Sequence, residues 1–137
     1  MAYSVNSNVI NGLPLPEALL AAMSEDRWTP PDSAVLAEVF GEQPEEPAFY
    51  SLEQMEFENR HWLARTGPLF LGTPEPAQPP GDLDPRSSLI IGDLGPDMPF
   101  ALDYRPATGP TVVYRKADGK WVMIAPSMDR LLSRLRD

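Results

Sequence analysis

A chain of 137 residues and 15.2 kDa is long enough for one domain with its own hydrophobic core, and its composition, 42% hydrophobic and 23% charged, is typical of a globular protein. The 20 acidic and 11 basic residues give a net charge of −9 and a pI of about 4.5, which argues against nucleic acid or an anionic membrane surface as a direct ligand. The chain has no cysteine, which excludes disulfides, thiolate zinc sites and cysteine nucleophiles. No apolar run approaches the roughly 18–20 residues of a membrane span, and residues 1–9 lack a secretory signal, so we expect a cytoplasmic protein.

The negative charge is concentrated in one part of the chain. Residues 17–58 hold 11 acidic residues and a single basic one, Arg27, whereas residues 59–100 carry a net charge of −2 and residues 101–137 a net charge of +3. Acidic runs are most often solvated helix faces, yet this asymmetry also indicates a surface that suits a basic partner. If the protein binds such a partner, the N-terminal half should face it.

The N-terminal half is predicted to be helical. Residues 1–12 are polar and predict a flexible leader, which leaves residues 13–137 as a single domain. The run Leu13-Pro14-Leu15-Pro16-Glu17, with proline at the first helical position and Glu17 in the first turn, opens a first helix that should end near Ser24 or Glu25. A second helix is predicted over residues 33–40, with Asp32 as its N-cap.

The third helix carries the clearest signals. Ser51 and Gln54 fit a capping box, in which Ser51 caps the helix and the Gln54 side chain reaches back, and Gly67–Pro68 should end the helix. The apolar residues 69–72 then predict a short buried strand. Residues 73–86 hold five prolines, so we expect an irregular surface loop there.

The C-terminal half is predicted to consist mainly of strands. Residues 88–91 form a compact apolar run, and residues 98–104 alternate in the manner of a strand. Residues 111–116 and 121–125 flank Asp118–Gly119, which is the strongest hairpin signal in the chain. These patterns favour an antiparallel sheet.

The position of Asp118–Gly119 also predicts the register of this hairpin. A two-residue loop pairs Ala117 with Lys120, and it therefore pairs Lys116 with Trp121. A slip of one residue would change every pair across the two strands, so the register is a sharp test of the pattern.

A leucine-containing helix over residues 128–136 is predicted to close the chain, with Ser127 as its cap. Helices come first, strands follow, and one helix comes last. This order predicts an α+β fold, in which an antiparallel sheet in the C-terminal half packs against the N-terminal helices and one C-terminal helix.

No catalytic constellation is visible. His61 is the only histidine, so it lacks a second histidine for a shared metal or a proton relay, and we interpret it as a polar residue of the third helix. Aspartates recur in the second half at positions 82, 84, 93, 97 and 103. The spacing of Asp93 and Asp97 could hold a divalent cation, but Asp in Gly- and Pro-rich stretches usually bonds its own backbone. We therefore expect tight turns there, with no metal and no cofactor.

The segment LIIGDLGPDMPFALDYR, residues 89–105, resembles the SUKH superfamily, the Smi/Knr-type domain. Its apolar strand, its Gly/Asp turn and its alternating strand that closes on Leu-Asp are similar to the pattern of that family. The resemblance continues through TVVY at residues 111–114, WVMIA at residues 121–125 and the leucine helix after Ser127. Upstream, the Leu-Pro helix start at residues 15–17 is similar to an early helix of the family.

This resemblance implies a binding module without catalytic residues. Bacterial members of the family are widely immunity proteins that neutralise partner toxins, often nucleases, and other members are regulatory scaffolds. A nuclease needs a basic surface to hold phosphate, so an acidic inhibitor would complement it and gain association rate from charge steering. The net charge of −9 agrees with this expectation.

We therefore predict a non-enzymatic protein-binding domain, an immunity protein whose acidic surface meets a partner toxin. The alternatives are a regulatory scaffold with no toxin partner and a small carboxylate-dependent hydrolase, which a pocket with two carboxyls of raised pKa would favour. Exposed strand edges would also allow a homo-oligomer, although nothing in the residues supports one. The candidate partner-binding residues are Glu42, Glu45, Glu46, Glu53, Glu56, Asp93 and Asp97.

Overall fold

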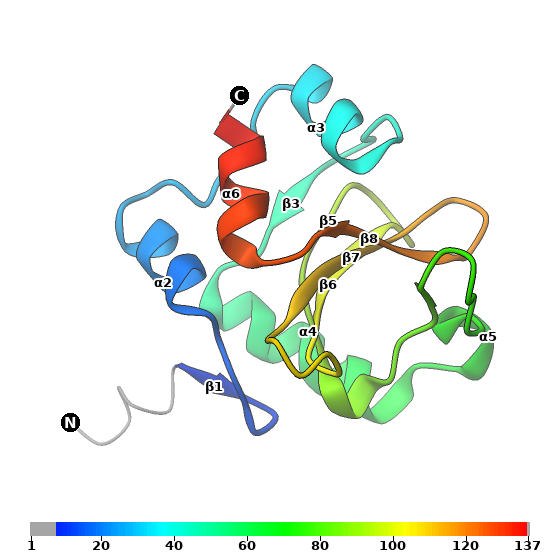
Figure 1. Cartoon of the computed structure of the whole chain (residues 1–137). Helices are drawn as coiled ribbons and strands as arrows, with labels where there is room; N and C mark the ends of the chain where they lie inside the picture. Colours follow the sequence, from blue (N-terminus) through cyan, green and yellow to red (C-terminus); the bar gives the residue numbers. More distant parts are fainter. Residues whose placement is uncertain (1–7, 137) are drawn as a thin grey trace.

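A six-stranded sheet forms the centre of the computed structural model, which describes residues 8–136 (Figure 1). Every pair of neighbouring strands in it is antiparallel. Four strands from the second half of the chain form its middle, and a two-residue strand forms each edge. In spatial order the strands are β3 (Ala48–Phe49), β5 (Ser88–Asp93), β6 (Pro99–Asp103), β7 (Thr111–Arg115), β8 (Trp121–Ala125) and β4 (Pro80–Gly81).

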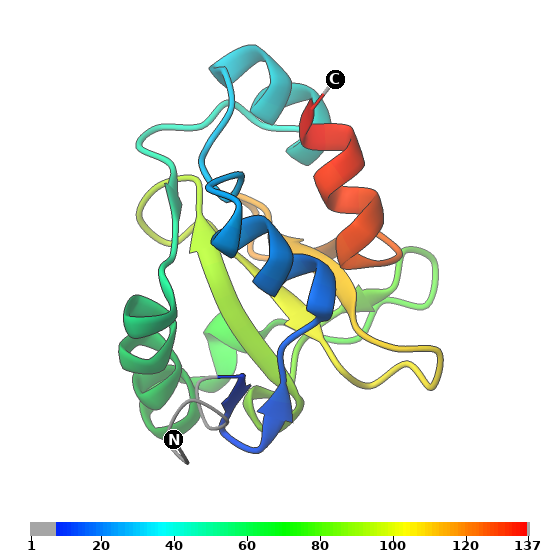
Figure 2. The same ribbon diagram turned by 90° about the vertical axis from the view of Figure 1, so that its left-hand side faces the viewer.

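Helices accompany this sheet in two groups. Within the described residues they are α2 (Glu17–Ser24), α3 (Ser33–Phe40), α4 (Leu52–Arg65), α5 (Pro68–Leu71) and α6 (Met128–Arg136), with one 3₁₀ turn, η1 (Pro85–Ser87). α6 packs against β7 and β8 and contacts α2 and α3, while α4 lies along β5 (Figure 2). The α+β fold is therefore confirmed.

The first described residues form a small hairpin rather than part of a flexible leader. Asn11 Nδ2 donates to the backbone oxygen of Asn59 at 3.1 Å, and Ile10 is buried, so the hairpin is fixed against α4. Its strands are β1 (Val9–Ile10) and β2 (Leu13–Pro14). The rest of the expected leader, residues 1–7, lies outside the described residues.

The helix ends follow the sequence signals only in part. Ser51 caps α4 by accepting the Gln54 N–H at 3.1 Å, as expected, but the Gln54 side chain donates to Glu58 Oε2 at 3.2 Å instead of reaching back. Ser127 accepts a backbone N–H in the first turn of α6 at 3.2 Å, which confirms that cap. Asp32 occupies the N-cap position of α3 as expected, but within the described residues its side chain makes no capping hydrogen bond to that helix.

The segment predicted as a short buried strand is a helical turn. Pro68 opens α5 with Gly67 before it, and Gly72 follows the turn with a φ of 78°. Leu69 is 94% exposed, so its apolar side chain marks no buried strand. The prediction for residues 69–72 is wrong because a short apolar run does not distinguish a strand from a helical turn.

The proline-rich segment 73–86 contains regular structure that was not expected there. It contributes β4, which pairs with Trp121 and Val122 of β8, and Gly72 forms a further bridge to Asp82. A strand that contains proline suits the edge of a sheet, because proline has no N–H to offer a further neighbour.

Next to its loop, the β7–β8 hairpin has a register one residue away from the predicted one, and an irregularity between Val112 and Val113 restores the predicted pairing of Val112 with Ala125. Arg115, rather than Lys116, lies opposite Trp121, because the loop has three residues instead of two. Gly119 has a φ of 89° and donates its N–H to Lys116 O at 2.8 Å, while the Lys116 N–H donates to Lys120 O at 2.9 Å. A glycine in this left-handed conformation is typical of a three-residue hairpin loop.

Two aromatic clusters fill the core. Around Phe100 of β6, ring centroids lie 5.0 to 6.3 Å away in Phe40, Phe49 and Trp28. The second cluster, with centroids 5.9 to 6.3 Å apart, contains Trp62, Phe70 and Trp121. β5 has an irregular register at Gly92, where a Cβ would collide with the Phe100 ring and the backbone oxygen of Ala48, so this close approach requires glycine.

The Asn59 side chain covers the part of the β5 edge that does not pair with β3. Asn59 of α4 is fully buried, and its amide accepts the Ile90 N–H at 2.8 Å and donates to the Ile90 C=O at 2.9 Å, as a neighbouring strand would. Next to this contact, Trp62 Nε1 donates to Ser88 Oγ at 3.0 Å. Within residues 8–136 the sheet edges are therefore short or closed, which weakens the argument for a homo-oligomer built by strand pairing.

Candidate functional site

The connection between α3 and β3 lies against the β5–β6 turn and brings acidic side chains together there. The N–H groups of Glu45 and Glu46 donate to the backbone oxygen of Leu94 at 2.8 and 3.0 Å. Both glutamates and Asp97 are exposed, and Asp93 at the end of β5 is half-buried. Together with a glutamate of α4 that faces Asp93, they form what we call the turn cluster: Glu45, Glu46, Glu58, Asp93 and Asp97.

Asp93 is a half-buried member of the turn cluster, and it makes two hydrogen bonds there. Its Oδ2 accepts the Tyr50 hydroxyl at 2.5 Å, and its Oδ1 accepts the Gly95 N–H at 3.1 Å. Burial raises the pKa of Asp93 above its ordinary value of 3.8, because the charged form is desolvated. The two hydrogen bonds oppose this shift, and the charges of Glu58 and Glu46 add to it. Burial and the neighbouring carboxylate also raise the pKa of Tyr50, so the phenol keeps its proton and donates a hydrogen bond to Asp93.

A cleft of about 420 Å³ opens beside the turn cluster and is lined by α4, α5, β5 and the β5–β6 turn. Three carboxylates of the cluster line it together with His61 and Arg65 of α4. His61 is exposed, and its Nδ1 lies 3.1 Å from Phe57 O, within its own helix. In the part of the chain that the structure describes, no three His, Asp or Glu side chains are grouped so as to hold a metal ion.

The other predicted partner-binding residues lie apart from the turn cluster. The Glu42 carboxylate accepts the Tyr114 hydroxyl at 2.8 Å and the Ala117 N–H at 3.0 Å, so it ties the segment after α3 to the β7–β8 hairpin. Glu53 and Glu56 are exposed near the start of α4. Four of the seven predicted residues therefore lie at the β5–β6 turn, whereas the Glu42 carboxylate is already hydrogen-bonded within the protein.

Glu58 is the member of the turn cluster that sequence reasoning missed. It lies four residues after Gln54, which donates to it, and four residues before the buried Trp62. Residues four apart share a helix face, so Glu58 had to lie on the side of α4 that packs against the sheet. Tyr50 was equally hard to find, because nothing in the sequence places its hydroxyl beside an aspartate 43 positions later.

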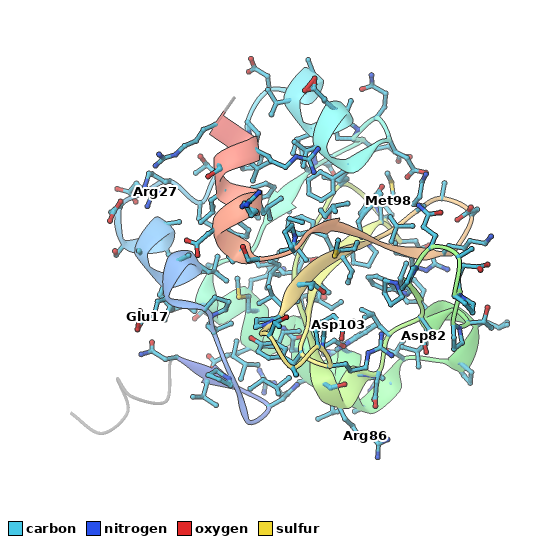
Figure 3. The ribbon with its side chains drawn as sticks, in the orientation of Figure 1. Glu17, Arg27, Asp82, Arg86, Met98 and Asp103 are labelled. Carbon is cyan, nitrogen blue, oxygen red and sulfur yellow. The ribbon has the colours of Figure 1, made fainter. Side chains whose placement is uncertain are left out.

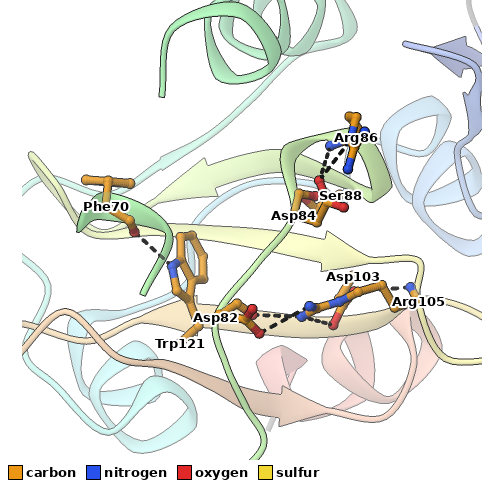
Figure 4. Close-up of polar contacts among 8 residues, drawn as sticks. All are labelled: Phe70, Asp82, Asp84, Arg86, Ser88, Asp103, Arg105 and Trp121. Atoms are coloured by element: carbon orange, nitrogen blue, oxygen red, sulfur yellow. Dashed lines mark hydrogen bonds and ion pairs between the residues drawn. The ribbon is translucent and has the colours of Figure 1, made fainter. Parts of the chain in front are cut away.

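A second group of carboxylates is paired with arginine (Figure 4). Arg105 donates from Nε and Nη2 to the two oxygens of Asp103 at 3.0 and 3.2 Å, and from Nη1 to Asp82 Oδ1 at 3.1 Å. These contacts raise the pKa of Arg105 and keep it charged. Asp103 is 4% exposed and lies inside the molecule, whereas Arg86 projects from its periphery (Figure 3). We call Asp82, Asp84, Asp103, Arg86 and Arg105 the arginine-paired group.

The expectation that aspartates bond their own backbone in tight turns is confirmed for three of the five positions. Asp84, Asp93 and Asp103 each accept the N–H of the residue two positions later, at 3.0 to 3.1 Å. The same contact lowers the pKa of Asp84, because the hydrogen bond from Arg86 stabilises its charged form. These side chains stabilise turns first, and any further role must be compatible with that.

Comparisons with protein-family models, with curated proteins and with solved structures find no match to this chain. None of the helices in residues 8–136 combines the length and the apolar character that a bilayer crossing requires. The most distinctive feature of the described residues is the contrast between the turn cluster and the arginine-paired group.

Proposed function

We propose that this chain is a non-enzymatic protein-binding domain that meets a basic partner through the turn cluster. The proposal is supported by the origin of the five carboxylates, which come from the α3–β3 connection, from α4 and from the β5–β6 turn. Within residues 8–136 none of the five forms an ion pair with a Lys or Arg side chain. Unpaired surface carboxylates repel one another and attract a cationic partner.

The biological role that we propose is that of an immunity protein of the SUKH type, which neutralises a partner toxin. The β5–β6 turn belongs to residues 89–105, whose pattern resembles that superfamily, so the family-like segment and the acidic surface coincide. A nuclease toxin has the right charge, because it needs a basic surface for phosphate. A regulatory scaffold without a toxin partner is the alternative that the same surface would serve.

The genes next to this one offer the first test. Each neighbouring reading frame is expressed in a bacterial host, alone and together with this chain, and growth is measured. We expect one neighbour to arrest growth alone and to be harmless when this chain is present. If no neighbour is toxic, or if the chain protects against none of them, the immunity role is wrong and the scaffold role is favoured.

The turn cluster is then tested with the toxin found in this way. Glu45→Lys with Glu46→Lys reverses two charges of the cluster, and Glu17→Lys with Glu38→Lys makes the same change in net charge at two exposed helix positions. We expect the first double variant to weaken binding roughly a hundredfold, because like charges then face each other across the interface, and the second to change it by less than about threefold. Equal effects would mean that total charge, rather than the turn cluster, governs binding.

A small carboxylate-dependent hydrolase is the second candidate, because Asp93 has a raised pKa and shares the cleft with Glu58. A general acid requires a carboxyl that stays protonated beside its substrate. Turnover of model esters or glycosides would support this candidate if Asp93→Asn abolishes it and Asp129→Asn, at an exposed position of α6, does not. Turnover that survives Asp93→Asn would exclude it.

A further inference from the structure

A second hollow, of about 470 Å³, lies beside β3 and is lined mainly by apolar side chains. Its lining comes from α2, from the segment after α2, from β3 and from the start of α4. We call it the β3 groove: Met23, Asp26, Trp28, Thr29, Phe49, Ser51, Leu52 and Glu53. Every one of these residues belongs to the segment 17–58, which holds 11 acidic residues and one basic residue.

β3 separates this groove from the cleft beside the turn cluster. Successive side chains of an extended chain point to opposite faces, so Phe49 and Ser51 line the groove while Tyr50 between them lines the cleft and binds Asp93. Trp28 Nε1 donates to Tyr50 O at 2.9 Å, and the Trp28 and Phe49 ring centroids are 4.5 Å apart. The groove is therefore built from fixed side chains at the edge of the sheet, next to the proposed binding surface.

We propose that the β3 groove takes an apolar side chain of the same basic partner, with Lys or Arg residues flanking that side chain against Asp26 and Glu53 on the rim. This inference rests on the proposed function and adds a hydrophobic anchor to it. Charge complementarity selects the occupant: the apolar walls suit an apolar side chain, and the acidic rim suits a cationic segment around it. An apolar anchor in a pocket, ringed by polar contacts, is the usual arrangement of an interface hot spot.

Two peptides test the groove by NMR titration of the isotope-labelled full chain: Lys-Lys-Phe-Lys-Lys and Lys-Lys-Ser-Lys-Lys. The indole N–H signals separate the two hollows, because Trp28 lines the groove and Trp62 lines the cleft. We expect the Phe peptide to bind roughly tenfold more tightly than the Ser peptide, as partial burial of one phenyl ring should give. We expect it to move the Trp28 signal more than the Trp62 signal.

Matched variants separate the groove from general charge effects. Thr29→Arg introduces a long side chain at an exposed position of the groove, and Thr108→Arg adds the same charge at an exposed threonine of the β6–β7 loop. We expect Thr29→Arg to bring the affinities of the two peptides to within about twofold of each other, whereas Thr108→Arg keeps the roughly tenfold difference. Both peptides carry the same charge, so the ratio of their affinities is insensitive to the added arginine itself.

Several outcomes would overturn this inference. Equal affinity for the two peptides, or a shift of Trp62 in place of Trp28, would refute the groove as the anchor site and leave the proposed function standing. If neither peptide binds at low salt, the acidic surface has no affinity for basic chains and both proposals fail. A Trp28 signal that moves with protein concentration, without peptide, would assign the groove to a second copy of this chain.

Discussion

The two ends of the β5–β6 strand pair have opposite electrostatic designs. At one end Asp103 lies opposite Ser88, and Arg105 binds both Asp103 and Asp82. At the other end Asp93 lies opposite Pro99 in the turn cluster, where within the described residues no arginine or lysine pairs with a carboxylate. Among the described residues, carboxylates therefore have arginine partners at one end and no Lys or Arg ion-pair partner at the other.

This difference identifies the end that is open to a partner. Asp103 is buried, and a buried carboxylate that loses its cationic partner is strongly destabilising, so stability explains its pairing with Arg105. In the turn cluster the charges of Glu58 and Glu46 disfavour the charged form of Asp93, so these carboxylates contribute no ion-pair stabilisation. Natural sequences retain unfavourable arrangements, such as neighbouring carboxylates without cations, mainly at functional sites. This favours the turn cluster as the binding surface.

The largest loss of stability is expected at the arginine-paired end. Arg105→Leu leaves Asp103 buried and unpaired and removes both contacts to Asp82. Loss of one partner of a fully buried pair costs about 3–5 kcal/mol, but the Arg105 side chain is 35% exposed, so we expect a loss of about 2 kcal/mol in the free energy of unfolding. Urea denaturation at neutral pH measures this loss.

The matched control for this prediction is Arg86→Leu. The Arg86 side chain is 83% exposed, and its Nε lies 3.5 Å from Asp84, so we expect a loss of no more than about 0.5 kcal/mol. Similar losses for the two arginine variants would show that burial of Asp103 does not control the stability of this end.

Local sequence signals predicted most of the elements but not their exact pairing. The strands that form β5 to β8 and the helices α2, α3, α4 and α6 follow from periodicity, capping and turn residues, which act over a few neighbours. The β7–β8 register failed by one residue because the choice between a two- and a three-residue loop depends on whether Gly119 occupies the last loop position. Residues 69–72 failed because Pro68 starts a helical turn there.

The position of the acidic segment could be predicted from the sequence, but the residues that bind each carboxylate could not. Counting residues located the acidic segment, and four of the predicted contacts do gather at the turn. No local pattern distinguishes Glu42, which binds Tyr114 72 positions away, from Glu45, whose side chain is exposed. The pairing of Arg105 with Asp82, 23 positions apart, is equally invisible in sequence. Long-range contacts decide which carboxylates remain available.

At the turn cluster, the hydrogen bond between Tyr50 and Asp93 is the contact whose loss should cost most. Tyr50→Phe removes a donor to a half-buried carboxylate, and we expect a loss of about 1.5 kcal/mol at neutral pH, as for hydrogen bonds to charged groups. Tyr104→Phe removes a 2.6 Å bond to the neutral Pro14 oxygen, for which about 0.5 kcal/mol is expected. Thermal and urea unfolding measure both, and a larger loss for Tyr104→Phe would contradict a charged Asp93.

The two ends should also respond to pH with opposite signs. The folded pKa of Asp93 is raised above 3.8, so the native state binds more protons than the unfolded state in the window just above 3.8. Its contribution to stability is present below that window and is lost as the pH rises through the folded pKa. The folded pKa of Asp84 is lowered, so its contribution is present above 3.8 and is lost as the pH falls.

The measurement compares the wild type with Asp93→Asn and with Asp84→Asn by urea unfolding at a series of acidic pH values. The wild type should lose stability relative to Asp93→Asn as the pH rises and gain stability relative to Asp84→Asn. If the stability of the wild type relative to each variant changed in the same direction as the pH rises, the assignment of a desolvated carboxyl to one end and a stabilised carboxylate to the other would be refuted.

The smallest expected effect tests whether the turn cluster repels itself. Glu46 adjoins Asp93, and its charge helps to raise the pKa of that carboxyl. Glu46→Gln should therefore lower the pKa of Asp93, followed by NMR of its carboxyl carbon, and stabilise the fold by about 0.3 kcal/mol, because one like-charge contact is removed. Glu38→Gln, at an exposed position of α3, removes the same charge elsewhere and should leave that pKa where it is. A destabilised Glu46→Gln would mean that this carboxylate stabilises the fold, and the turn cluster would then resemble the arginine-paired end it is contrasted with.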